Sequence, residues 1–207
     1  LQPYDIGSVH VMFGSELEIE NNKSFAVTQQ PDIAEFDVED TRREIILRSS
    51  CFSVTVNKKA GYISLLDKSG KLLLKEWPEK ARMNVHGDSV SAYCRFQLQD
   101  EEALYGLGQF RDNLMNLRNA KRELVQFNTQ AAVPVIYSTG KWGLFWDNPS
   151  RTIYADNNAG MSFVSDYGRI VNYYLFVGDG MDKLVAAYRS LTGVAPMLPA
   201  WALGYHQ

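Results

Sequence analysis

The feature of this sequence that most constrains its fold is a period-two alternation of apolar and polar side chains. Phe52, Val54 and Val56 take one parity, whereas Ser53 and Thr55 take the other. Successive side chains of a strand point to opposite faces, so this alternation predicts strands that bury one face. Similar runs recur over most of the 207 residues, which predicts an all-β chain.

Turn-forming residues divide the alternating runs into short, closely spaced strands. Residues 57–61 (NKKAG) and 67–70 (DKSG) separate three runs and predict a three-stranded antiparallel meander. The residues 21–23 (NNK) separate two shorter runs, which predicts a hairpin over residues 17–29. The predicted strands cover residues 17–20, 24–29, 43–48, 52–56, 62–66, 71–75, 90–98, 133–137, 141–146, 170–177 and 199–205.

One segment near the C-terminus has the period of a helix instead. Between Met181 and Leu191, the side chains of Leu184, Tyr188 and Leu191 fall at i, i+4 and i+7 and so share one helix face. Gly193 stands where a helix commonly ends in a left-handed residue. Many short strands with one helix predict an antiparallel β-sandwich with a single short C-terminal helix.

Charge and composition exclude several classes of partner. The chain carries 21 basic and 24 acidic residues, a net charge of −3, so no bulk positive field attracts nucleic acid. No run approaches the roughly 18 apolar residues that a membrane-spanning helix requires. Cys51 and Cys94 fall in apolar strand patterns, where a free, buried thiol is the commoner state, and a disulfide between them is left open. With His10, His86 and His206 they show no metal-ligand spacing.

The aromatic and glycine-rich segments favour structural roles. Trp142 and Trp146 share a strand face, which favours core packing over a sugar-stacking platform. Gly106 and Gly108 flank Leu107 without a following helix, so they predict a bulge or bend rather than a dinucleotide loop.

Two groups of acidic residues are interpreted as solvated charges of loops or sheet edges rather than as catalytic groups. They are Asp37, Glu39 and Asp40, and the pair Glu101 and Glu102.

The second half of the chain contains a series of short motifs in a fixed order. These are LYGLGQ (104–109), FNT (127–129), VPVIYS (133–138), WGLFWDN (142–148), YYLFVG (173–178), YRSLTG (188–193) and PAWALGYHQ (199–207). The series resembles the N-terminal domain of glycoside hydrolase family 31, which includes α-glucosidases and α-xylosidases. The resemblance is close over residues 104–207. Over the first hundred residues it is limited to the same succession of short strands and turns. It implies a galactose-mutarotase-like supersandwich.

The resemblance also implies the domain organisation of a longer enzyme. Residues 1–197 would form the N-terminal sandwich, and residues 198–207 would begin the first strand of a truncated (β/α)8 catalytic barrel. The family hydrolyses α-linked sugars with retention, using two Asp side chains that lie on the barrel, after Gln207. We therefore expect no catalytic residue in this chain, no activity of the chain alone, and no cofactor, because two carboxylates suffice for the chemistry.

One loop of the sandwich is implied to contact substrate in this family. In this sequence it contains the substrate-binding candidates Asn128, Thr129 and Gln130. Some members have Asp where Gln130 stands, and an amide donates as well as accepts hydrogen bonds, which puts glucose-type contacts in doubt. The amino-acid sequence of this loop, NTQAAVP (128–134), is similar to that of bacterial α-xylosidases.

Two other functions compete with the non-catalytic domain of a retaining α-glycosidase. A freestanding carbohydrate-binding module fits the sandwich and the aromatic residues. A mutarotase-like enzyme would need a histidine placed with a carboxylate, and His86 near Asp88 instead suggests a surface turn.

The expected partners are a carbohydrate substrate, through the full-length enzyme, and the chain's own barrel. Self-association of the exposed apolar surfaces and a periplasmic or extracellular bacterial location are further expectations.

Overall fold

A computed structural model of the chain describes residues 1–4, 7–29, 31–78 and 82–204. These residues form α1 (Glu16–Glu20), α2 (Met181–Thr192) and a 3-10 turn, η1 (Ala200–Leu203). The strands are β1 (Gln2–Tyr4), β2 (Ser8–Phe13), β3 (Phe36–Asp40), β4 (Glu44–Ser49), β5 (Phe52–Asn57), β6 (Ile63–Asp67), β7 (Leu72–Glu76), β8 (Met83–His86), β9 (Ser89–Gln97), β10 (Leu104–Gln109), β11 (Lys121–Leu124), β12 (Ala131–Ser138), β13 (Trp142–Trp146), β14 (Thr152–Asn157), β15 (Gly160–Ser165) and β16 (Val171–Val177).

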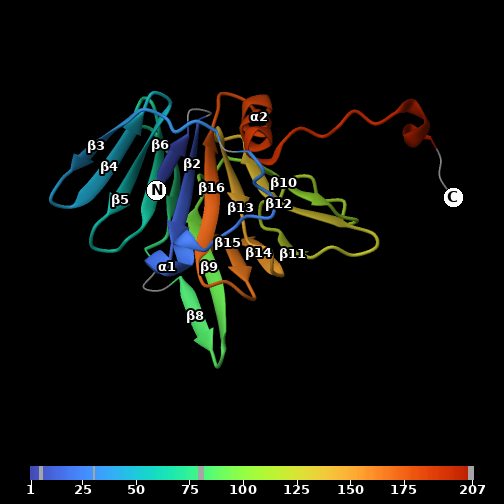
Figure 1. The fold of residues 1–207 in the computed structure, drawn as a ribbon, viewed down its shortest axis with the longest axis horizontal. Helices are drawn as coiled ribbons and strands as arrows, with labels where there is room; N and C mark the ends of the chain where they lie inside the picture. The colour runs from blue at the N-terminus through green and yellow to red at the C-terminus, as the bar shows by residue number, and fades with distance from the viewer. Residues whose placement is uncertain (5–6, 30, 79–81, 205–207) are drawn as a thin grey trace.

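The strands build two antiparallel sheets that pack face to face, as Figure 1 shows. The smaller sheet has the order β1-β2-β16-β13-β12-β10. The larger sheet has the order β11-β14-β15-β9-β7-β6-β5-β4-β3, and β8 also pairs with β9. The predicted antiparallel β-sandwich is therefore confirmed, including the meander β5-β6-β7.

The turns of the meander form for the reason that the sequence suggested. The side-chain oxygen of Asn57 accepts hydrogen bonds from the backbone N–H groups of Lys59 and Ala60. Asp67 does the same for Ser69 and Lys71 in the next turn. Such Asx turns satisfy backbone donors that would otherwise face water, and they reverse the chain between strands.

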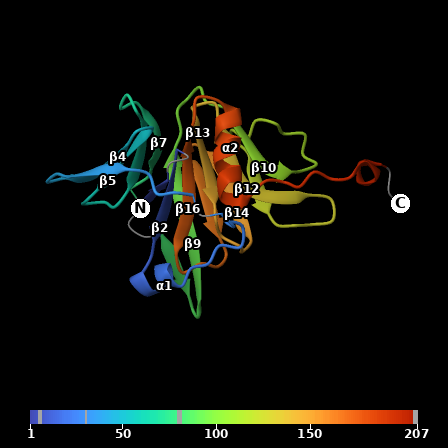
Figure 2. The same cartoon turned by 45° about the horizontal axis from the view of Figure 1, so that its top comes forward.

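The strands β13 and β16 are buried on both faces, which explains their continuous apolar runs. Trp142 and Trp146 point between the sheets and are fully buried, as expected of core residues. Phe145 points the opposite way, into a second cluster with Leu184 and Leu191 of α2. The helix crosses the outer face of the smaller sheet (Figure 2), so its predicted apolar face is confirmed.

The hairpin predicted over residues 17–29 is wrong, because Glu16–Glu20 form the helix α1. Ser15 caps this helix by accepting a hydrogen bond from the backbone N–H of Glu18. A serine followed three residues later by a glutamate is the capping-box signal for a helix start, and it outweighs the short alternation of residues 17–20.

The strand predicted over residues 199–205 is also not formed in the described residues. Ala200–Leu203 form a 3-10 turn instead, and the segment after α2 runs away from both sheets (Figures 1 and 2). A strand needs a neighbouring strand for its hydrogen bonds, and none of the described strands pairs with this segment. Residues 205–207, which include His206, lie outside the described residues, so the barrel strand stays a prediction.

Two expectations about single side chains need correction. Glu102 is buried rather than solvated, and its carboxylate accepts hydrogen bonds from the indole of Trp142 (2.7 Å), the hydroxyl of Ser138 and the backbone N–H of Gln99 (2.6 Å). Cys51 is exposed rather than buried, and neither it nor Cys94 forms the disulfide that the sequence left open. Glu101 and the acidic residues of β3 are exposed, as predicted.

Candidate functional site

The loop that carries the predicted substrate-binding residues connects β11 to β12. It extends from the sandwich on the side toward which the C-terminal segment also runs (Figures 1 and 2). Asn128 and Thr129 are exposed, whereas Gln130 is half-buried. The side-chain amide of Gln130 donates a 3.1 Å hydrogen bond to the carbonyl of Val125, so it closes the loop on itself. Asn128 and Thr129 thus present exposed polar side chains, and Gln130 holds the loop that carries them.

A β-bulge in the neighbouring strand supports the base of this loop. The register between β10 and β12 shifts between Gly106 and Gly108, which confirms the bulge expected from the glycine spacing. Leu107 between them is fully buried with a φ of 62°, a conformation that is rare for residues other than glycine. Gly108 pairs with Ala132, and a Cβ atom at Gly108 would overlap the carbonyl oxygen of Ala131.

Arg122 of β11 ties a second loop to the same region. Its guanidinium donates two hydrogen bonds to the carboxylate of Asp112 (2.7 and 2.8 Å) and one to the carbonyl of Leu114 (3.0 Å). It also stacks on the ring of Phe110, 4.5 Å from the ring centre. These hydrogen bonds hold the pKa of Asp112 below its usual value. The chain over residues 110–114 is therefore fixed against β11, the strand that precedes the β11–β12 loop.

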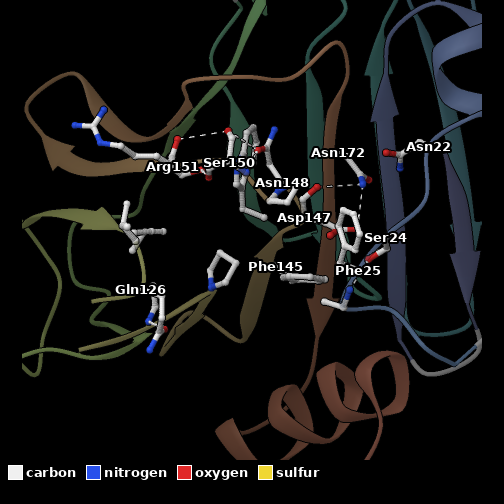
Figure 3. Close-up of a pocket in the computed structure, with 18 of the residues that line it drawn as sticks. Asn22, Ser24, Phe25, Gln126, Phe145, Asp147, Asn148, Ser150, Arg151 and Asn172 are labelled. Atoms are coloured by element: carbon white, nitrogen blue, oxygen red, sulfur yellow. Dashed lines mark hydrogen bonds between the residues drawn. The ribbon is translucent and has the colours of Figure 1, made fainter. Parts of the chain in front are cut away.

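A pocket of about 360 Å³ opens beside these loops (Figure 3). One wall is the segment 22–26, the opposite wall comes from residues 124–126 with Ala132 and Pro134, and the floor is the turn between β13 and β14. These segments are far apart in the sequence, which is why no local motif indicated the pocket.

A line of polar side chains runs from the pocket into the smaller sheet. Asp147, on the pocket floor, accepts a 3.1 Å hydrogen bond from the amide of Asn172, whose oxygen lies 2.5 Å from Nε2 of His10. Burial raises the pKa of Asp147, and hydrogen bonds from Ser24 and Asn172 partly oppose that shift. Burial lowers the pKa of His10 to about 4, and its ring stacks on Tyr174 at 4.0 Å. His10 is therefore neutral near pH 7.

The histidines and acidic side chains of the described part of the chain are spread over the fold. Within that part, no group of three or more His, Cys, Asp and Glu side chains is arranged to hold a metal ion. His86 is exposed at the end of the β8–β9 hairpin, as the surface-turn interpretation expected. In the same described residues, no helix is long and apolar enough to cross a membrane.

Comparison with known proteins decides the family. Residues 1–154 match the sequence profile of the glycosyl hydrolase 31 N-terminal galactose mutarotase-like domain. The chain belongs to this family. The match includes the first hundred residues, where the sequence shared with the glycosyl hydrolase 31 domain only its succession of strands and turns.

Curated relatives of the glycosyl hydrolase 31 domain are much longer than this chain. An α-xylosidase of Saccharolobus solfataricus is 29% identical over 205 residues, which are 94% of this chain and 28% of the relative. The α-glucosidase 2 of Bacillus thermoamyloliquefaciens is 26% identical over 96% of this chain and 27% of its own length. The chain therefore spans little more than a quarter of these relatives.

Solved structures of glycosyl hydrolase 31 proteins share the fold. A family 31 α-xylosidase from a soil metagenome, solved with xylose, superposes with a TM-score of 0.87 at 25% identity, over 98% of this chain and 33% of that one. The family 31 α-xylosidase of Xanthomonas citri has a TM-score of 0.83 at 20% identity, over 97% and 39%, which concerns the fold alone.

Proposed function

We propose that this chain is the non-catalytic N-terminal domain of a retaining α-glycosidase that acts on α-linked xylosides or glucosides of plant or storage oligosaccharides. The observation that carries the proposal is the family match over residues 1–154, together with curated relatives that are an α-xylosidase and an α-glucosidase. In such an enzyme the sandwich would support a catalytic barrel and lend it one loop.

The reaction would be carried out by groups outside this chain. Retention requires one carboxylate that attacks the anomeric carbon and one carboxylic acid that protonates the leaving oxygen, about 5–5.5 Å apart. We assign neither role to a residue of this chain. Two carboxyl groups complete this chemistry, so the proposal includes no metal or organic cofactor.

Within this proposal the β11–β12 loop is the part of the domain that approaches the sugar. Asn128 and Thr129 would supply polar contacts, and Gln130 would hold the loop through its hydrogen bond to Val125. In the longer enzyme, Gln130→Ala is expected to lower kcat/KM more than tenfold, about 1.4 kcal/mol or more of transition-state stabilisation. Gln97→Ala, on β9 of the other sheet, is the matched control. An unchanged kcat/KM in the Gln130 variant would remove the loop from the proposal.

The deciding experiment compares the 207-residue chain with the product of its complete gene on aryl α-xyloside and aryl α-glucoside. We expect that only the longer protein hydrolyses these substrates and that it retains the anomeric configuration. The sugar that it prefers then assigns the specificity. Hydrolysis by the short chain would overturn the non-catalytic role. A gene that ends at Gln207 would favour the freestanding binding module. A periplasmic or extracellular location is part of the proposal, and fractionation of the source cells tests it.

A further inference from the structure

The pocket in Figure 3 has no part in the function proposed above. The candidate substrate residues Asn128, Thr129 and Gln130 do not line it, although Gln126, at the base of their loop, does. Its volume of about 360 Å³ lies within the range of small-molecule sites, roughly 300–1,000 Å³. Apolar side chains, among them Phe145 and Pro134, meet several polar ones along its wall.

An aromatic ring stands at the mouth of the pocket. The side chain of Phe25 is 86% exposed, more than that of any other phenylalanine in the described residues. Its backbone is nevertheless fixed, because the hydroxyl of Ser24 accepts hydrogen bonds from the N–H groups of Ala26 (3.1 Å) and Val27 (2.9 Å). An exposed ring on an ordered backbone can stack on the C–H face of a sugar ring with little loss of entropy.

A carboxylate with spare acceptor capacity lies on the pocket floor. Asp147 is half-buried, and among the described residues it forms no ion pair. Its known donors are neutral, the amide of Asn172 and the hydroxyl of Ser24. A carboxylate offers about four acceptor sites, and a ligand hydroxyl would add a charge-assisted hydrogen bond.

The charges around the pocket favour an uncharged ligand. Three charged side chains line it, Asp147, Lys23 and Arg151. Arg151 is already paired with Glu123 (2.6 Å) and Asp166 (2.9 Å), so one acid and one base remain. This balance attracts neither an anion nor a cation strongly.

We propose that this pocket binds a neutral pyranose unit of an oligosaccharide, with Phe25 stacking on the ring and Asp147 accepting a hydrogen bond from a hydroxyl. Amide groups of Asn22 and Gln126, on opposite walls, would complete the polar contacts. Binding there would keep a carbohydrate chain on the domain without any catalytic step. The proposal does not depend on the hydrolytic function, because it concerns binding by this chain.

The test uses the 207-residue chain, whose hydrophobic core lies between its own two sheets. The chain is titrated with methyl α-xyloside, maltose or isomaltose, and NMR chemical shifts report binding. Saturable binding with a Kd of about 1–10 mM is expected for at least one of these probes. Phe25→Ala should raise that Kd at least fivefold, and Asp147→Asn should raise it as well. Phe36→Ala, a matched exposed phenylalanine on β3, should leave it unchanged.

Several outcomes would overturn the proposal. These are no saturable shift at about 50 mM ligand, an equal loss in the Phe25 and Phe36 variants, or tighter binding of glucuronate or glucosamine than of the neutral sugars. The Phe25 effect should also persist in the longer gene product. Binding that occurs only in the short chain would identify the pocket as a covered interdomain surface and refute the assignment. Hydrolysis is not a readout here, so failure of this test leaves the proposed enzyme function untouched.

Discussion

The hydroxyl of Tyr173 on β16 donates a 2.6 Å hydrogen bond to the carboxylate of Glu76 on β7, and so joins the two sheets through their buried core. Glu76 also accepts from the thiol of Cys94 (3.2 Å), the backbone N–H of Ile63 (2.7 Å) and the guanidinium of Arg82 (2.5 Å). Burial raises the pKa of Tyr173 and of Cys94, so both remain protonated donors. The buried carboxylate is thus fully partnered.

Tyr173→Phe should lower the free energy of unfolding by about 1–3 kcal/mol, because it removes one donor from a buried charged acceptor. Urea denaturation followed by tryptophan fluorescence measures this. Tyr105→Phe is the control, since the half-buried Tyr105 has no hydroxyl hydrogen bond in the described structure. Equal stabilities of the Tyr173 variant and the parent would show that the inter-sheet bond contributes nothing.

Glu102→Ala should destabilise the chain by about 2–4 kcal/mol, because it leaves the buried indole N–H of Trp142 and the hydroxyl of Ser138 without their acceptor. Glu101→Ala changes an exposed neighbour and should stay within about 0.5 kcal/mol of the parent. Chemical denaturation of both variants makes the comparison. Similar losses at the two positions would contradict the buried assignment of Glu102.

Gly108→Ala should destabilise the bulge by more than about 2 kcal/mol, because the new Cβ adds a clash with the carbonyl of Ala131 to the strain of a positive φ. Gly61→Ala is the matched control, with a similar φ of +70° and nothing within 4 Å of the new atom, and should cost about 1–2 kcal/mol. Thermal unfolding of both variants gives the two losses of stability, and their difference is the cost of the clash. Amide NMR shifts should move in residues 125–132 for the Gly108 variant only.

The stability of the fold should fall as the pH drops from about 6.5 to about 4, because of His10. The pKa of His10 is about 4 in the fold and near 6.5 when unfolded, so the unfolded chain binds the extra proton in this window. The loss should reach about 3 kcal/mol below pH 4.

His10→Gln should flatten this dependence, while its amide can still meet Asn172. The measurement is the difference in the free energy of unfolding between variant and parent at each pH. This difference cancels the contributions of carboxyl groups such as Asp147, whose raised pKa makes the fold more stable as the pH falls. A difference that stays constant across pH would contradict the lowered pKa of His10.

Concentration-dependent self-association of the isolated chain is expected, because the C-terminal segment exposes Met197 (96%), Trp201 (76%) and Leu203 (74%). Light scattering over a range of protein concentrations measures it. The double variant Trp201→Ser and Leu203→Ser should restore a monomer. A parent chain that is already monomeric at high concentration would refute the expectation.

The sequence by itself determined the fold class, the meander and the helix α2. These depend on periods and turn residues that act locally, such as the alternation of Phe52, Val54 and Val56 or the spacing of Leu184 and Leu191. A strand or helix face is set by neighbours a few residues away, whatever its partner is. The family motifs added the kind of enzyme to expect.

Only the tertiary structure decided which charges are buried and where a pocket lies. Glu76 and Tyr173 are 97 residues apart, and Glu102 meets Trp142 across 40. Local polarity predicted solvation for Glu102, but the loop between β9 and β10 folds onto the smaller sheet, where Ser138 and Trp142 supply the donors that make its burial favourable. The pocket likewise requires residues 22–26 to lie opposite residues 124–126, a proximity that no local pattern encodes.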